Sequence, residues 1–224
     1  MFLGHFALAF GAKKAVPAVS LGALFMACQF ADLLWPVLVL AGVEEVRIQP
    51  GATAVTPLDF VRYPFSHSLT ALLGWGTLVG GIYGVAIRSP MFAGVMLGLL
   101  VVSHWVLDVV THRPDMPLTV RGTTRLGLGL WNSLPATLAV ELFLFAAGIA
   151  LYWRATVARD RLGSVGLWSL VVFLAVAYFA SVFGPPPPDA RTVAWSAMAM
   201  WLLVLWGYWV DRHRFPASSF GGRR

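Results

Sequence analysis

Charged residues are scarce in this sequence. Only 12% of its 224 residues are charged, whereas 58% are apolar. A soluble domain of this size carries roughly twice that charged fraction. The shortage of charge excludes an ordinary soluble protein and predicts an integral membrane protein.

Several signals of other protein classes are also missing. A single cysteine, Cys28, excludes an internal disulfide. The His-Glu-x-x-His motif of metalloproteases is absent, and five histidines are too few for the paired histidine motifs of membrane diiron oxygenases. No basic stripe with interleaved aromatic residues is present, so we expect no nucleic-acid partner. Protein partners do not follow from the sequence.

Long apolar segments dominate instead, and six of them approach the length of about 20 residues that crosses a bilayer. They cover residues 16–42, 69–87, 91–111, 134–153, 165–184 and 192–210. Residues 1–11 are apolar but too few to cross alone. We predict an all-α fold, a polytopic membrane helical bundle of about six transmembrane helices plus a short N-terminal half-helix. Gly76, Gly80 and Gly84, spaced by four, predict a close helix contact.

The basic residues predict an orientation. Of the 16 lysines and arginines, the six-span arrangement places ten on one side and six on the other, and the richer side is expected in the cytoplasm. Both termini then lie on the cytoplasmic side of a bacterial-type inner membrane. The net charge of +6 is largely explained by this orientation.

Three ionisable residues follow one another at steps of four near the end of the third span. His104, Asp108 and His112 project from one face of a helix and can converge on a common point. An uncompensated aspartate within a span costs about 2.5 to 3.5 kcal/mol on insertion scales. We therefore expect Asp108 to face a polar interior.

Three further residues lie at compatible depths. His5 occurs in "GHFALAF", Asp32 in "ADLLWP" and His67 in "YPFSHSL". Pro36 lacks the amide hydrogen that would bond the Asp32 carbonyl, so we expect a bend there. Ser66 is expected to cap the second span and to place His67 in its first turn. These positions put the cluster in the outer half of the membrane.

This set of donors suits a divalent metal. Neutral imidazoles and carboxylates without thiolate are the usual ligands of zinc, the preferred ion here, and they also suit manganese or iron. There are enough donors for one ion or for two ions bridged by Asp108. Asp108 and Asp32 are the candidate catalytic carboxylates, with Asp32 orienting an activated water. Arg62 and Arg113 flank the ligands and are candidates for binding substrate phosphate, or for anchoring lipid headgroups.

The quoted segments, followed by "SHWVLDVVTHRPDMPL", resemble the YdjM-like inner-membrane family of metal-dependent hydrolases over roughly residues 1–118. Their order is also similar to the zinc-dependent phospholipase C and single-strand nuclease group. The resemblance implies that one metal is held by Asp32, His67, His104 and Asp108, and that His5 and Asp108 contribute to a second.

The chain departs from the phospholipase and nuclease pattern in two ways. A later His-x-x-x-Glu pair is absent, and His112 is the candidate that replaces it in part. Those enzymes also use an N-terminal amine, which here requires Met1 to fold into the site. The resemblance implies metal binding more directly than it implies a reaction.

Three functions can use this cluster. We favour a membrane-embedded hydrolase that acts on a phospholipid or another phosphoester, with residues 1–133 forming the metal-site half and residues 134–224 the scaffold half of one integrated membrane domain. A metal-ion or proton transporter would use the same residues as a relay, but it predicts polar residues along the full depth of the spans. In a non-catalytic scaffold, His104 and Asp108 would form a hydrogen-bonded pair between helices.

Overall fold

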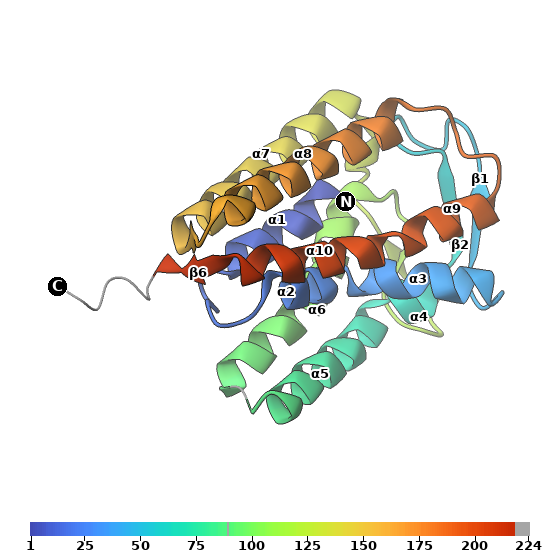
Figure 1. The fold of residues 1–224 in the computed structure, drawn as a ribbon. Coiled ribbons are helices and arrows are strands. Elements are labelled where there is room, and N and C mark those ends of the chain that lie inside the picture. Colours follow the sequence, from blue (N-terminus) through green and yellow to red (C-terminus); the bar gives the residue numbers. More distant parts are fainter. Residues whose placement is uncertain (89, 218–224) are drawn as a thin grey trace.

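The structure is a computed structural model that describes residues 1–88 and 90–217, so the last seven residues of the predicted scaffold half lie outside the described part. It is an all-α bundle (Figure 1). Five of the described helices are long and apolar enough to cross a membrane, or six if one bent pair counts as a span. This result confirms the predicted membrane helical bundle. The five are α5 (Leu69–Ala86), α6 (Met91–Thr111), α7 (Leu134–Ala155), α8 (Arg161–Phe183) and the segment of α9 (Ala190–Met198) with α10 (Met200–Arg212).

The short N-terminal segment lies in the centre of the bundle. Helix α1 (Leu3–Ala12) packs mainly against α7 and against α2 (Leu21–Cys28). Most of its residues are buried, because other helices cover it on several sides. Because α1 is covered in this way, it places His5 deep inside the protein.

The first predicted span is broken. Helices α2 and α3 (Phe30–Leu40) meet at an angle of 57°. We expected the bend at Pro36, but Pro36 lies inside α3 and the break falls at Gln29. The carbonyl of Cys28, next to the break, accepts a hydrogen bond from His104 at 2.8 Å. The break therefore coincides with a contact that the local sequence does not reveal.

Glycines bring α5 and α6 together as predicted. A Cβ atom added at Gly80 would lie 2.3 Å from the carbonyl oxygen of Gly94, and one at Gly76 would lie 2.7 Å from that of Gly98. Gly84, the third glycine of the repeat, has nothing within 4 Å of its added Cβ. Gly76 and Gly80 thus form the close contact between the two helices. The backbones can approach so closely because no side chain lies between them.

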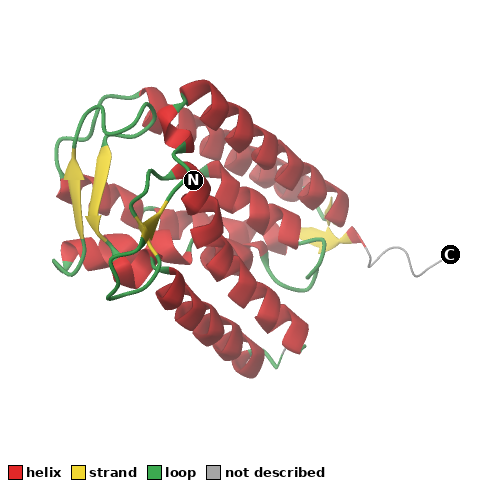
Figure 2. Ribbon diagram, turned by 180° about the vertical axis from the view of Figure 1, so that it is seen from behind, coloured by secondary structure: helices red, strands yellow, loops and turns green. Residues whose placement is uncertain are grey.

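Short strand pairs mark the two ends of the bundle (Figure 2). The antiparallel hairpin of β1 (Glu45–Ile48) and β2 (Leu58–Arg62), with Val46 opposite Phe60, lies at one end, here called the hairpin end. The pair β3 (Met116–Pro117) and β4 (Arg125–Leu126), the one-turn helix α4 (Pro64–His67) and the 3-10 helix Leu130–Asn132 belong to its loops. The pair β5 (Thr156–Ala158) and β6 (Arg214–Pro216) lies at the other end, here called the tail end.

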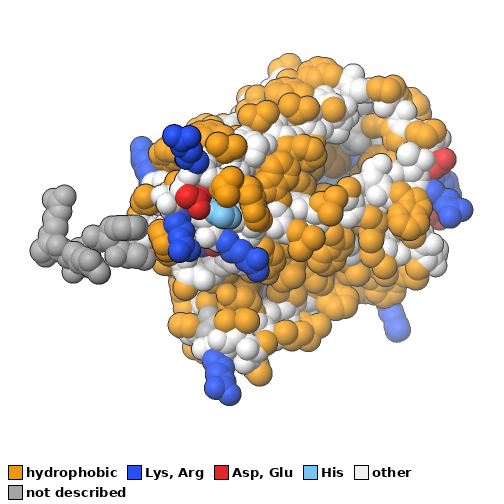
Figure 3. Space-filling view, viewed as in Figure 1, with side chains coloured by type: hydrophobic (Ala, Val, Ile, Leu, Met, Phe, Trp, Pro, Cys, Tyr) orange, Lys and Arg blue, Asp and Glu red, His pale blue; other side chains and the backbone are white. Residues whose placement is uncertain are grey.

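An aromatic core separates the two ends. Phe25 contacts Phe6 and Phe10 with ring centroids 4.9 Å and 5.1 Å apart, and Phe10 also contacts Tyr152 at 5.3 Å. On the tail-end side of this core, Nζ of Lys13 lies 2.6 Å from Oδ2 of Asp211 and forms an ion pair with it. On the outside, apolar side chains cover much of the α8 and α10 face, and lysines and arginines gather towards the ends (Figure 3). This distribution fits a protein that crosses a bilayer.

Candidate metal centre

The structure brings the predicted ligand residues together from four separate helices and one helix end. His5 comes from α1, Asp32 from α3, and His67 from the last position of α4. His104 and Asp108 lie on α6, and His112 follows directly after it. All are buried except Asp32, whose side chain is 28% exposed.

Asp108 is at the centre of the cluster. Its Oδ1 lies 3.1 Å from Nε2 of His5, and its Oδ2 lies 3.1 Å from Nε2 of His104. The amino group of Met1 also contacts Oδ1. Met1 therefore folds into the site, where its amino group contacts the Asp108 carboxylate. From the sequence we expected Asp108 to need compensation within its span, and nitrogen atoms of Met1, His5 and His104 surround its carboxylate.

Asp32 is the centre of a second group of contacts, next to the group around Asp108. Its Oδ1 lies 3.3 Å from Nε2 of His67 and 3.7 Å from Nε2 of His104. Two groups of three residues have candidate ligand atoms within 4.8 Å of one another, and both can hold a metal ion. The first is His5, His104 and Asp108, and the second is Asp32, His67 and His104. His104 belongs to both groups, so the two positions adjoin.

Hydrogen bonds to the opposite ring nitrogens orient two of these imidazoles. Nδ1 of His104 donates to the Cys28 carbonyl at 2.8 Å. Ser66 donates its hydroxyl hydrogen to Glu44 at 2.6 Å, so its oxygen can accept from Nδ1 of His67 at 2.7 Å. In each neutral ring Nε2 then carries the lone pair that a metal needs.

The surroundings of one buried nitrogen atom indicate whether a cation fits the site. Nε2 of His104 is fully buried and has no hydrogen-bond partner among the described residues, although it faces carboxylate oxygens. A buried polar atom without a partner is costly. A divalent cation between the imidazoles and carboxylates would satisfy it, so the donor set fits the implied metal.

The predicted cap of the second span is not where we expected it. Ser68, not Ser66, caps α5 by accepting a hydrogen bond from the Ala71 amide at 3.2 Å. His67 therefore ends the short helix α4 and does not occupy the first turn of α5. Ser66 instead bonds His67 and Glu44, and its hydroxyl is used to hold the imidazole.

His112 lies beside the two ligand groups and outside both. Its Nε2 is 4.0 Å from Oδ2 of Asp108, and its Nδ1 is 2.9 Å from Oδ1 of Asp115. The Tyr63 hydroxyl donates to the same Asp115 oxygen at 2.9 Å. Burial alone would raise the pKa of Asp115, but hydrogen bonds from His112, Tyr63 and Arg113 lower it overall. Asp115 is thus an ionised partner for the His112 ring.

The two predicted phosphate-binding arginines are not brought to the cluster. Arg113 pairs with Asp59 and with Asp115. Arg62 is exposed, and its guanidinium lies 3.5 Å from the Gly42 carbonyl. Neither side chain lines the cavity described below. In the structure Arg62 ends strand β2 and Arg113 lies in the loop after α6, both at the hairpin end.

Three acids outside the predicted ligand set support the site, and two of them, Glu44 and Asp115, were given no role from the sequence. Glu44 lies in a loop without periodicity, so no pattern pointed to its contact with Ser66. Asp115 follows His112 at a spacing of three, a signal that could have been used. Glu141 of α7 is buried and accepts hydrogen bonds from the Phe2 and Gly4 amides, both at 3.2 Å. It holds the start of α1, and therefore His5, in place.

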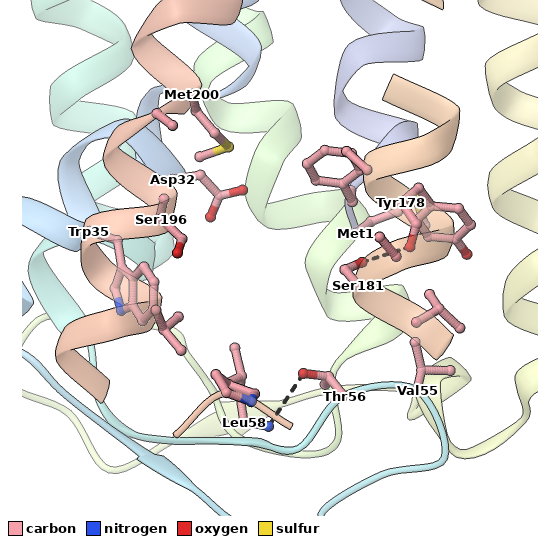
Figure 4. Close-up of a pocket in the computed structure, with 18 of the residues that line it drawn as sticks. Met1, Asp32, Trp35, Val55, Thr56, Leu58, Tyr178, Ser181, Ser196 and Met200 are labelled. Atoms are coloured by element: carbon pink, nitrogen blue, oxygen red, sulfur yellow. Dashed lines mark hydrogen bonds between the residues drawn. The ribbon is translucent and has the colours of Figure 1, made fainter. Parts of the chain in front are cut away.

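A large cavity opens on the cluster (Figure 4). Its volume is about 810 Å³. Asp32 points into it. His67, Asp108 and His112 also line it, and their contacts with one another and with Asp32 put them at the same end. Most other lining side chains are apolar and come from α8, α9, α10 and the loops at the hairpin end. The cavity thus joins one polar end to an extended apolar space.

Comparison of the chain with protein-family models, with curated proteins and with solved structures finds no significant match. The resemblance to the YdjM-like family therefore stays a prediction from the quoted motifs.

Proposed function

We propose that the protein is a membrane-embedded metal-dependent hydrolase that cleaves a phosphoester or a lipid ester. The observation that carries this proposal is the convergence of three imidazole Nε2 atoms and two carboxylates at the polar end of the cavity. Metal-assisted hydrolysis needs ligands held in place and an adjoining space for substrate.

The donors favour zinc, and manganese or iron would also suit them. Asp32, His67, His104 and Asp108 would hold one ion, and His5 with the second oxygen of Asp108 would contribute to an adjoining one, because the single lone pair on Nε2 of His104 can bind only one ion. When bound, such an ion supplies Lewis-acid polarisation of the ester and a more acidic water. The Ser66 and Cys28 contacts keep the imidazoles in the tautomer that binds it.

Two residues at the cavity wall have geometry suited to proton transfer. Asp32 is the most exposed member of the cluster and points into the cavity, so its carboxylate can orient a water and accept its proton. His112 lines the cavity, and Asp115 fixes its Nδ1. Nε2 of His112 can then hold a proton and deliver it to a leaving oxygen.

Transport is less well supported than hydrolysis. A transporter needs a polar path from one side of the membrane to the other. Between the cluster and the Lys13–Asp211 pair lie Phe6, Phe10 and Phe25, all buried, and the Phe25 ring contacts the other two. This aromatic core favours a site that is reached from one side.

The remaining parts of the proposal follow from the sequence. We place the chain with the YdjM-like inner-membrane proteins, with membrane lipid as a candidate substrate and no nucleic-acid partner. The hairpin end and the His/Asp cluster would face the outer leaflet of the bacterial-type inner membrane, and the tail end would face the cytoplasm. Charge distribution supports this orientation.

The direct test is hydrolysis of a chromogenic phosphodiester by protein purified in detergent, stripped with a chelator and reloaded with zinc, manganese or iron. Activity should return with at least one of these ions. Asp108→Asn should abolish it, whereas Asp211→Asn, a change to an acid paired with Lys13 at the tail end, should retain it. No metal-dependent hydrolysis in the parent, together with metal uptake into proteoliposomes, would contradict hydrolysis and support transport.

A further inference from the structure

The walls of the cavity diverge along the membrane-spanning helices. At the tail end α8 and α10 are close, because a Cβ atom added at Gly166 would lie 2.5 Å from the Trp209 ring. Further along, Phe173 and Trp206 contact each other with ring centroids 5.6 Å apart. Beyond that contact α9 packs against α3, and Figure 1 shows it separating from α8. The two walls therefore splay apart towards the hairpin end.

The gap between them is the mouth of the cavity. Ser181 from α8 and Ser196 from α9 stand on opposite walls in Figure 4, and both are exposed although they line the cavity. Ala199 and Leu202 continue the α9–α10 wall and are also exposed. The space-filling view shows a hollow in this region (Figure 3).

Exposed apolar side chains stand on both helical walls beside the mouth. Its borders carry Val176 and Phe183 on α8, each 61% exposed, and Trp195 and Leu202 on the opposite wall, 61% and 65% exposed. These residues belong to helices long and apolar enough to span a membrane. Large apolar side chains exposed on such helices are expected to face lipid. A ligand passing between α8 and α9 would therefore arrive from within the bilayer.

The interior of the cavity matches an amphiphile. Its polar end is formed by Asp32, His67, Asp108 and His112, and its apolar part by side chains such as Phe173, Leu203 and Trp206. A volume of about 810 Å³ falls within the range of roughly 300–1,000 Å³ seen for ligand pockets. We propose that the cavity takes a bilayer phospholipid laterally between α8 and α9, with one acyl chain in the apolar part and the phosphate at the cluster. The placement of the phosphate rests on the proposed function.

The test uses the full chain in phosphatidylcholine vesicles that contain phosphatidylglycerol with a diazirine on one acyl chain. After irradiation, adducts should map to cavity residues with little outside exposure, such as Leu203 and Trp206. Ala177→Trp places a bulky side chain in the cavity wall and should reduce these adducts by about tenfold, the effect of a modest steric clash on affinity. Ala146→Trp, on an exposed position of α7 outside the cavity, should leave them unchanged.

Adducts found only on lipid-facing residues outside the cavity, or cavity adducts unaffected by Ala177→Trp, would overturn the lateral-entry proposal. Metal content and hydrolysis of a water-soluble phosphodiester, measured on the same protein, separate the two proposals. Metal-dependent hydrolysis without cavity adducts would overturn lipid entry alone. Cavity adducts without metal binding or hydrolysis would support the acyl-chain site in the cavity and contradict the proposed hydrolase.

Discussion

The imidazole rings of His5 and His104 stack face to face, with centroids 3.7 Å apart and planes 3° from parallel. The two residues lie 99 positions apart, yet their Nε2 atoms approach the two oxygens of the same Asp108 carboxylate. The stacking holds both nitrogens beside one acid, and binding of one ion by both rings would require them to tilt from this parallel arrangement, because each lone pair lies in its ring plane.

The Ser66 hydroxyl should matter for metal affinity. It holds Nδ1 of His67 and is itself bonded to Glu44, and loss of such an outer contact typically weakens binding about 10- to 100-fold. Ser66→Ala should show this loss in a metal titration. Ser68→Ala is the matched control, because removing the α5 cap should cost ~1 kcal/mol of stability without changing the affinity. Equal affinities for both variants would count against the role given to Ser66.

His112 should be dispensable for metal binding. Its Nε2 lies outside both candidate ligand groups, and its Nδ1 is bonded to Asp115. His112→Ala should therefore keep its metal, and its hydrolysis of a phosphodiester should fall by about 10²- to 10⁴-fold, the usual contribution of a proton-transfer group. Loss of the metal in this variant would instead make His112 a ligand, as the sequence analysis expected.

The glycine contact between α5 and α6 should be sensitive to one methyl group. In Gly80→Ala the new Cβ would collide with the Gly94 backbone, and such overpacking costs about 1–3 kcal/mol. Thermal unfolding in detergent should show a lower midpoint for this variant. Gly84→Ala, with nothing near its Cβ, should match the parent. Equal midpoints for the two variants would contradict the close contact.

Orientation can be tested by cysteine labelling. The native Cys28 is 1% exposed and should not react with a membrane-impermeant maleimide. Gln49→Cys, at the hairpin end, should be labelled from outside intact cells, whereas Val157→Cys, at the tail end, should react only after the membrane is opened. The reverse pattern would show that the orientation inferred from basic residues is inverted.

Composition was enough to predict membrane-spanning helices, although the first predicted span is broken, and the spacing of four placed His104 and Asp108 on one helix face. The structure brings His5, Asp32 and His67 beside them. The break at Gln29 was not predictable, since it accompanies a hydrogen bond between Cys28 and His104, which lies 76 residues away. Ser66 and Ser68 are both plausible caps locally, and only the contacts of Ser66 with Glu44 and His67 separate their roles. The cavity depends on how α9 packs against α3, which no periodicity encodes.

The central claim is that the His/Asp cluster holds a metal, and mass spectrometry of the purified, folded protein measures it directly. Zinc, manganese or iron should be present stoichiometrically in the parent and lost in Asp108→Asn and His104→Ala. It should be retained in the matched controls Asp211→Asn and His213→Ala, which change an acid and a histidine at the tail end. Absence of metal from the parent even after reloading, or equal metal content in all four variants, would contradict the account.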